Sequence, residues 1–95
     1  PKAVDCPAID GIIKETNEVA GEVDDKDVLD AALIASAQAV EHYEMTRYGT
    51  LMAWAKQLGR NDCASVLAQN LKEEQATDKK LSALGEGSIN MQAAE

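Results

Sequence analysis

Residues 28–58 read VLDAALIASAQAVEHYEMTRYGTLMAWAKQL, and this stretch decides the fold. Ala dominates its apolar residues, which favours helix over strand. Asp27 directly before the stretch is a good N-cap residue. Gly59 directly after it is a natural residue for the position beyond a helix C-terminus. We therefore predict one helix over 28–58, a rod roughly 45 Å long.

A second long helix follows after a very short connection. Asn61 or Asp62 caps it, and apolar residues at helical spacing continue over 62–84. A connection of so few residues forces the two helices into an antiparallel hairpin.

The flanking segments are shorter. Pro7 suits a first helical turn, and the stripe that follows it predicts a helix over 7–20 that ends at Gly21. Residues 21–27 are a polar, acidic loop. Residues 85–95 lose the periodicity, so we predict a flexible tail. The fold class is thus all-α.

Composition excludes several functions. Ninety-five residues make one domain, and nine basic against seventeen acidic residues give a net charge of −8. This charge argues against nucleic acid and against an anionic membrane surface as partners. No apolar run approaches the ~20 residues of a transmembrane helix. Cys6 and Cys63 form no metal-binding or disulfide motif, so we expect free thiols. Free thiols are typical of a reducing compartment and no secretory signal is visible, so we expect a cytoplasmic location.

Four acidic residues occupy apolar positions of the two long helices. Glu44 comes seven residues after Ala37 and seven before Leu51, and Glu41 stands in the same relation to Ile34 and Tyr48, so both acids share a helix side with apolar residues. Glu74 lies between Leu67 and Leu81 in the same spacing, and Asp78 follows Leu71 by seven residues. If the hairpin folds at residue 60, Glu44 is level with Glu74, and Glu41 with Asp78.

Carboxylates in an apolar contact need compensation, because each loses several kcal/mol of hydration. Shared protons, basic partners or a cation can supply it. The inward positions offer only Arg47 as a base, and Arg47 falls beyond the acids toward the turn. A metal pair is the simplest compensation, and oxygen ligands suit Mn, Fe, Mg or Ca better than Zn or Cu. The alternative is that a helix is rotated and the acids reach water.

Several strings of the sequence carry a family resemblance. They are DAALIASAQAVEHYE from Asp30 to Glu44, Tyr48-Gly-Thr, the stretch from Ala55 to Gly59, and EEQATD over 73–78. Together they resemble the YciF-type family of ferritin-like proteins, from about Cys6 to Asn90. The rubrerythrin branch is similar around Glu41 to Glu44 and near Glu74.

The resemblance implies a ferritin-like four-helix bundle around a dinuclear centre of Fe or Mn. Glu41 and Glu44 match the pair of acids on the third bundle helix, and Glu74 matches the Glu of the fourth. The family's His falls on Thr77, and Asp78 is the expected substitute ligand. The missing imidazole weakens the expectation of ferroxidase or oxygenase chemistry.

The resemblance also implies that the chain is half of a bundle. The first two bundle helices have no counterpart, and residues 7–20 match the crossover helix. Either an N-terminal half is missing, or a homo-oligomer, in the simplest case a dimer, completes the bundle.

Three further residues are candidates for supporting the metal ligands: His42, Tyr48 and Thr77. His42 also suits a partly exposed position with no such role, and Tyr48 also suits packing. Trp54 is expected in the core near the turn, with Leu51, Leu58 and Leu67.

The resulting hypothesis is a stress-associated di-metal carboxylate protein. If it is redox active, iron oxidation or peroxide removal is the expected chemistry. The alternative is a non-catalytic helical oligomerisation module with a vestigial or redox-inert metal site. The sequence leaves open whether the protein is an enzyme.

Overall fold

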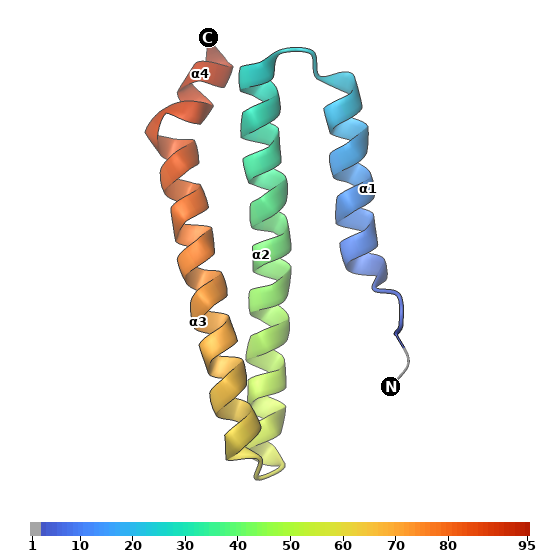
Figure 1. The fold of residues 1–95 in the computed structure, drawn as a ribbon, viewed down its shortest axis with the longest axis vertical. Helices are drawn as coiled ribbons and strands as arrows, with labels where there is room; N and C mark the ends of the chain where they lie inside the picture. The colour runs from blue at the N-terminus through green and yellow to red at the C-terminus, as the bar shows by residue number, and fades with distance from the viewer. Residues whose placement is uncertain (1–2) are drawn as a thin grey trace.

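The computed structural model describes residues 3–95, whose three long helices lie in a single layer (Figure 1). The element order is α1 (Pro7–Glu22), α2 (Lys26–Gln57), α3 (Asn61–Leu84), the π-helical turn η1 (Gly85–Ile89) and α4 (Asn90–Ala94). The layer measures 53 × 30 × 15 Å between Cα atoms, so its thickness is half its width. The predicted all-α class is confirmed.

Helix α2 is the central element, and α1 and α3 flank it (Figure 1). It begins two residues earlier than predicted, because Asp25 is its N-cap instead of Asp27. The Asp25 carboxylate accepts hydrogen bonds from the backbone N–H groups of Asp27 (2.8 Å) and Val28 (3.2 Å). Asp27 lies in the first turn, where a negative charge also stabilises the helix.

Helix α1 ends two residues later than predicted. Gly21 and Glu22 continue the helix, and the N–H of Val23 donates to the carbonyl of Val19 (3.2 Å). Glycine costs helical stability but does not forbid the conformation.

The connection between α2 and α3 makes the predicted antiparallel hairpin. Gly59 has φ 72°, a conformation that glycine adopts without strain, and the N–H of Arg60 donates to the carbonyl of Ala55 (2.8 Å). The residue before α3 is Arg60, so neither Asn61 nor Asp62 is its N-cap. The Asp62 carboxylate instead accepts from the guanidinium of Arg60 (3.1 Å).

The prediction of a non-periodic tail after Leu84 is wrong. Residues 85–89 form a π-helical turn and residues 90–94 a short helix, and both pack against α2. Gly85 is buried at this bend, where a Cβ atom would lie 3.2 Å from the Asn90 side chain. The close approach at Gly85 lets the chain return toward the start of α2 (Figure 1).

Very few side chains within residues 3–95 are buried, and Trp54, Leu51 and Leu58 do not form the predicted core near the turn. Only Ala55 and Ala64 are buried apolar residues there. Trp54 is 57% exposed, Leu51 43% and Leu58 79%. The prediction for Trp54 fails because a single layer covers each helix only along its edges. No helix in the described part of the chain has the length and apolar character of a membrane span.

Candidate metal centre

Three of the four predicted acids converge between α2 and α3. Glu41, Glu44 and Glu74 each offer a carboxylate oxygen, and these atoms lie within 4.8 Å of one another. All three residues are half-buried. Glu41 and Glu44 share a face of α2 because they are three residues apart, and the short turn brings Glu74 of α3 to the same height. We call these three residues the carboxylate triad.

The carboxylates of the triad perturb one another. A hydrogen bond with Glu74, together with burial and the charge of Glu74, raises the pKa of the Glu44 carboxyl. A hydrogen bond with Glu41 raises the pKa of Glu74, and burial and the charges of Glu41 and Glu73 act in the same direction, against an opposing hydrogen bond with Glu44. A contact between like charges therefore favours retention of protons at this point.

One atom of the triad lacks a partner. Oε2 of Glu41 is buried and accepts no hydrogen bond within the part of the chain that the structure describes. A buried oxygen without a partner costs ~1–3 kcal/mol, and more if it is charged. A cation would supply the missing partner, so the donor set fits a metal that prefers oxygen ligands.

Asp78, the fourth predicted acid, is bound to other side chains. It lies one turn further along α3, where its Oδ1 atom contacts Nε2 of His42 (3.0 Å) and accepts from the Gln38 amide (3.3 Å). Gln38 also donates to the hydroxyl of Ser82 (2.7 Å). Asp78 therefore forms a polar bridge between α2 and α3, next to the triad and outside its 4.8 Å group.

The three supporting candidates differ in their positions. His42 is exposed and touches Asp78, so it contacts one of the predicted ligands. Tyr48 is half-buried on α2. Thr77 is exposed, and its hydroxyl donates to the carbonyl of Glu73 within α3 (3.1 Å). The Thr77 hydroxyl is thus engaged with its own helix.

Sequence reasoning missed two contacts. Gln38 lies one turn before His42 on the same side of α2, and this spacing was the available signal for the Asp78 bridge. The second contact joins the thiol of Cys6 to the hydroxyl of Tyr43 (3.3 Å). The Arg47 guanidinium lies 5.1 Å from the centre of the Tyr43 ring. The sequence gives no signal for the Cys6 contact, because the two residues are 37 positions apart.

Comparison with known proteins identifies relatives along nearly the whole chain. A family model described as "Domain of unknown function (DUF892)" matches residues 1–94. The protein YciF of Escherichia coli K12 is 48% identical over 92 residues, which are 97% of this chain and 55% of that protein.

Two solved structures are similar. The structure of the E. coli stress protein YciF matches with a TM-score of 0.84 at 48% identity, over 94% of this chain and 56% of that chain. YcfI from Rhodopseudomonas palustris matches with a TM-score of 0.83 at 61% identity, over 86% of this chain and 52% of that one. The chain thus spans about half the length of the relatives it matches.

Proposed function

We propose that this chain, which belongs to the DUF892 family and is a relative of YciF, binds a pair of Fe or Mn ions. The proposal rests on the family membership and on the carboxylate triad. The site is a carboxylate centre of the ferritin-like kind. The observation that carries the proposal is the convergence of Glu41, Glu44 and Glu74, with oxygens within 4.8 Å and a buried oxygen of Glu41 unpaired.

The ligands divide into two groups. Glu41, Glu44 and Glu74 would hold the metal directly, and Asp78 would join them by a rotation of its side chain. His42 and Gln38 contact Asp78 and would orient it. Tyr48 and Thr77 are the other supporting candidates, and Tyr48 is the better suited, since the hydroxyl of Thr77 already donates to its own helix.

The chemistry of such a centre would be redox chemistry if iron is bound. An iron pair held by Glu41, Glu44 and Glu74 would supply the two electrons that, with two protons, reduce one peroxide to two water molecules, each iron going from Fe(II) to Fe(III). The raised pKa values of Glu44 and Glu74 favour retention of protons, which a bound cation would displace. A role in stress agrees with the description of the E. coli relative as a stress protein. A cytoplasmic location agrees with the free thiols of Cys6 and Cys63.

The test is a titration with Mn(II), because free Mn(II) gives an electron paramagnetic resonance signal that weakens when the ion is bound. We expect the wild-type chain to bind Mn(II). Glu74→Gln keeps the size of the side chain and removes its charge, so it should weaken binding by more than about 100-fold.

The matched control is Glu73→Gln, which makes the same change at the exposed neighbouring position. It should leave Mn(II) binding close to that of the wild type. Equal binding by the Glu74 and Glu73 variants would refute the triad as the site. Adding Fe(II) and peroxide to the wild type then tests whether the bound metal turns over.

A second candidate function is a non-catalytic helical assembly module. The observation that favours it is the large apolar surface that α2 and α3 leave uncovered, including Leu51, Trp54 and Val66. In that case the triad would hold a redox-inert ion or none, and Fe(II) would not be oxidised faster than in the Glu74→Gln variant.

A further inference from the structure

Asp78 has two possible sets of partners, the carboxylate triad on one side and polar side chains of α2 on the other. It follows Glu74 by four residues, so the two side chains lie one turn apart on the same side of α3. Its Oδ1 atom contacts Nε2 of His42 (3.0 Å) and accepts from the Gln38 amide (3.3 Å). A move of the Asp78 carboxylate toward the triad would therefore compete with both of these contacts.

The Gln38 amide also has a second acceptor, and this one is closer. Its Nε2 atom lies 2.7 Å from the Ser82 hydroxyl, compared with 3.3 Å from Oδ1 of Asp78 and 3.5 Å from the backbone carbonyl of Asp78. An amide NH₂ group carries two donors, and both Gln38 and Ser82 are half-buried. When the Asp78 carboxylate leaves, the Gln38 amide keeps the Ser82 hydroxyl as its partner, so the release costs less free energy.

The other partner of Asp78 is open to water. The side chain of His42 is 64% exposed, whereas that of Asp78 is 19% exposed. Water can replace the carboxylate at Nε2 of His42, and exposed contacts of this kind add little to stability. The Asp78 carboxylate is therefore held by contacts that a cation at the triad can outcompete, because a cation attracts a negative charge across several ångströms.

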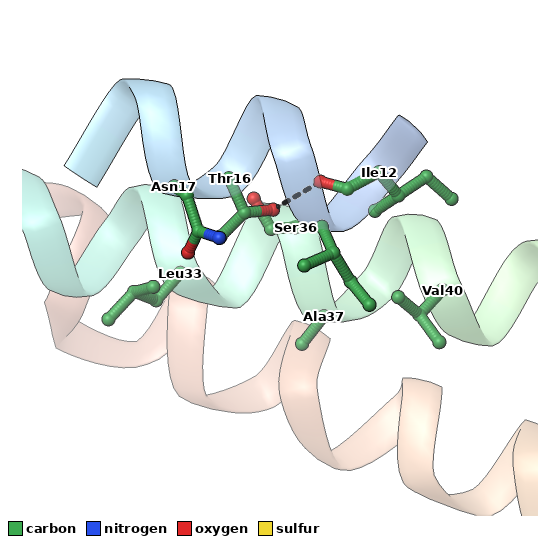
Figure 2. Close-up of a pocket in the computed structure, with 8 residues that line it drawn as sticks. Ile12, Thr16, Asn17, Leu33, Ser36, Ala37 and Val40 are labelled. Atoms are coloured by element: carbon green, nitrogen blue, oxygen red, sulfur yellow. Dashed lines mark hydrogen bonds between the residues drawn. The ribbon is translucent and has the colours of Figure 1, made fainter. Parts of the chain in front are cut away.

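These contacts do not involve α1. Gln38 is not among the residues that line the pocket of about 270 Å³ between α1 and α2, where Ser36 and Ala37 lie beside Ile12 and Thr16 (Figure 2). The pocket and the Asp78 bridge thus use different residues of α2. A change at Gln38 leaves the lining of this pocket intact, and Ser36 offers a matched control on the pocket side.

We propose that Asp78 is a mobile ligand, held by Gln38 and His42 in the metal-free chain and released to the carboxylate triad when a metal ion binds. Ser82 keeps the Gln38 amide hydrogen-bonded after the release, so Gln38 and Ser82 are positioning residues that act through Asp78. All four residues of the bridge lie on α2 and α3, so the proposal needs no contact outside the hairpin. It rests on the proposed function, because it concerns a ligand of the same centre.

Mn(II) titration of two variants tests the proposal, because the expected effects have opposite signs. Gln38→Leu keeps roughly the size of the side chain and removes the competing donor. It should tighten Mn(II) binding by about threefold to tenfold, the contribution of one hydrogen bond. Ser82→Ala removes the alternative acceptor and leaves the Gln38 amide dependent on Asp78, so it should weaken Mn(II) binding by a similar factor. A bridge that only holds the helices together would lose binding in both variants.

Two control variants make the same chemical changes away from the bridge. Ser36→Ala removes a half-buried hydroxyl on the pocket side of α2, and Gln57→Leu changes an exposed glutamine at the end of α2. Both should bind Mn(II) as the wild type does. If Gln38→Leu loses its helical circular dichroism, Ser82→Ala decides, since alanine favours helix.

The Asp78→Asn background shows whether both effects pass through Asp78. Asparagine removes the charge of the proposed ligand, so neither Gln38→Leu nor Ser82→Ala should alter Mn(II) binding there. Effects in the same direction, the absence of any effect, or effects that persist in Asp78→Asn overturn the proposal.

Failure of the proposed function gives a different result. A wild-type chain that binds no Mn(II) refutes the metal site and the mobile ligand together. A wild-type chain whose Mn(II) binding is lost in Glu74→Gln, but is unchanged in Gln38→Leu and Ser82→Ala, sustains the metal site and overturns the mobile ligand alone.

Discussion

At the scale of single residues, the triad links protonation to stability. The raised pKa of Glu44 means that the folded chain binds this proton more tightly than the unfolded chain does. Just above pH 4.5, the ordinary value for Glu, the folded state then holds more protons than the unfolded state. The contribution to stability is present at low pH and is lost as the pH rises through the raised pKa.

We therefore predict that the melting temperature of the metal-free chain falls as the pH rises above 4.5, and that Glu44→Gln reduces this fall. The amide of Gln carries no charge at any of these pH values, so the repulsion with Glu74 disappears. Thermal melts followed by circular dichroism from pH 4 to 7 measure the effect, with Glu73→Gln as the control. Parallel pH profiles for wild type and Glu44→Gln would contradict it.

The thiol of Cys6 offers a test that does not involve metal. Its hydrogen bond with the Tyr43 hydroxyl lowers the pKa of the thiol, and the thiolate is the reactive form. Tyr43→Phe removes the hydroxyl and should slow alkylation of Cys6 near neutral pH, whereas Cys63 of the same molecule serves as an internal control. Peptide mapping after a short pulse of iodoacetamide measures both rates, and an unchanged ratio between them would argue against the contact.

Among individual residues, the sequence predicted that four acids converge, and the structure brings three of them together while Asp78 contacts Gln38 and His42. Heptad spacing brought Glu41, Glu44 and Glu74 to one height because helical geometry is regular. Spacing cannot say which acid finds a competing partner. Gln38 and His42 hold Asp78 through side-chain hydrogen bonds, and such bonds depend on rotamers that a one-dimensional pattern does not contain.

At the scale of helices, the ends of α2 are the best defined features. Asp25 satisfies two backbone N–H groups of the first turn, so Asp25→Ala should destabilise the chain by about 1 kcal/mol. Asp27→Ala should cost less, because Asp27 acts only through its charge near the helix N-terminus. Urea unfolding of the two variants compares them directly, and a larger loss for Asp27→Ala would restore Asp27 as the cap.

The turn between α2 and α3 depends on a left-handed backbone. Gly59 has φ 72°, where a residue with a Cβ atom pays roughly 1–2 kcal/mol. Gly59→Ala should lower the melting temperature for this reason, although nothing within 4 Å would meet the added Cβ atom. Gly49→Ala, in the middle of α2, is the control and should be neutral or stabilising. Similar losses in both variants would contradict the assignment.

The helices themselves could be predicted because propensity, capping and apolar spacing agree over long stretches. The ends could not, since Asp24, Asp25 and Asp27 are all plausible capping residues by type. The helical structure of 85–94 escaped prediction because Gly85 and Gly87 disfavour helix locally, while packing against α2 decides the outcome.

At the scale of the whole molecule, a layer 15 Å thick cannot bury a core. The apolar spacing of the sequence predicted inward positions for Trp54 and Leu51, yet both are exposed, because helices that lie side by side cover one another only along their edges. Periodicity predicts which side of a helix is apolar, but it does not predict what packs against that side.

The most direct test of the central claim, that the carboxylate triad binds metal, is native mass spectrometry after reconstitution with Fe(II) without oxygen or with Mn(II). It counts chains and ions in the same particle. We predict a bound pair of ions in the wild type, and none in the Glu44→Gln, Glu74→Gln double variant of unchanged helicity. Wild-type chains that carry no ion, or a double variant that carries as many as the wild type, would contradict the account.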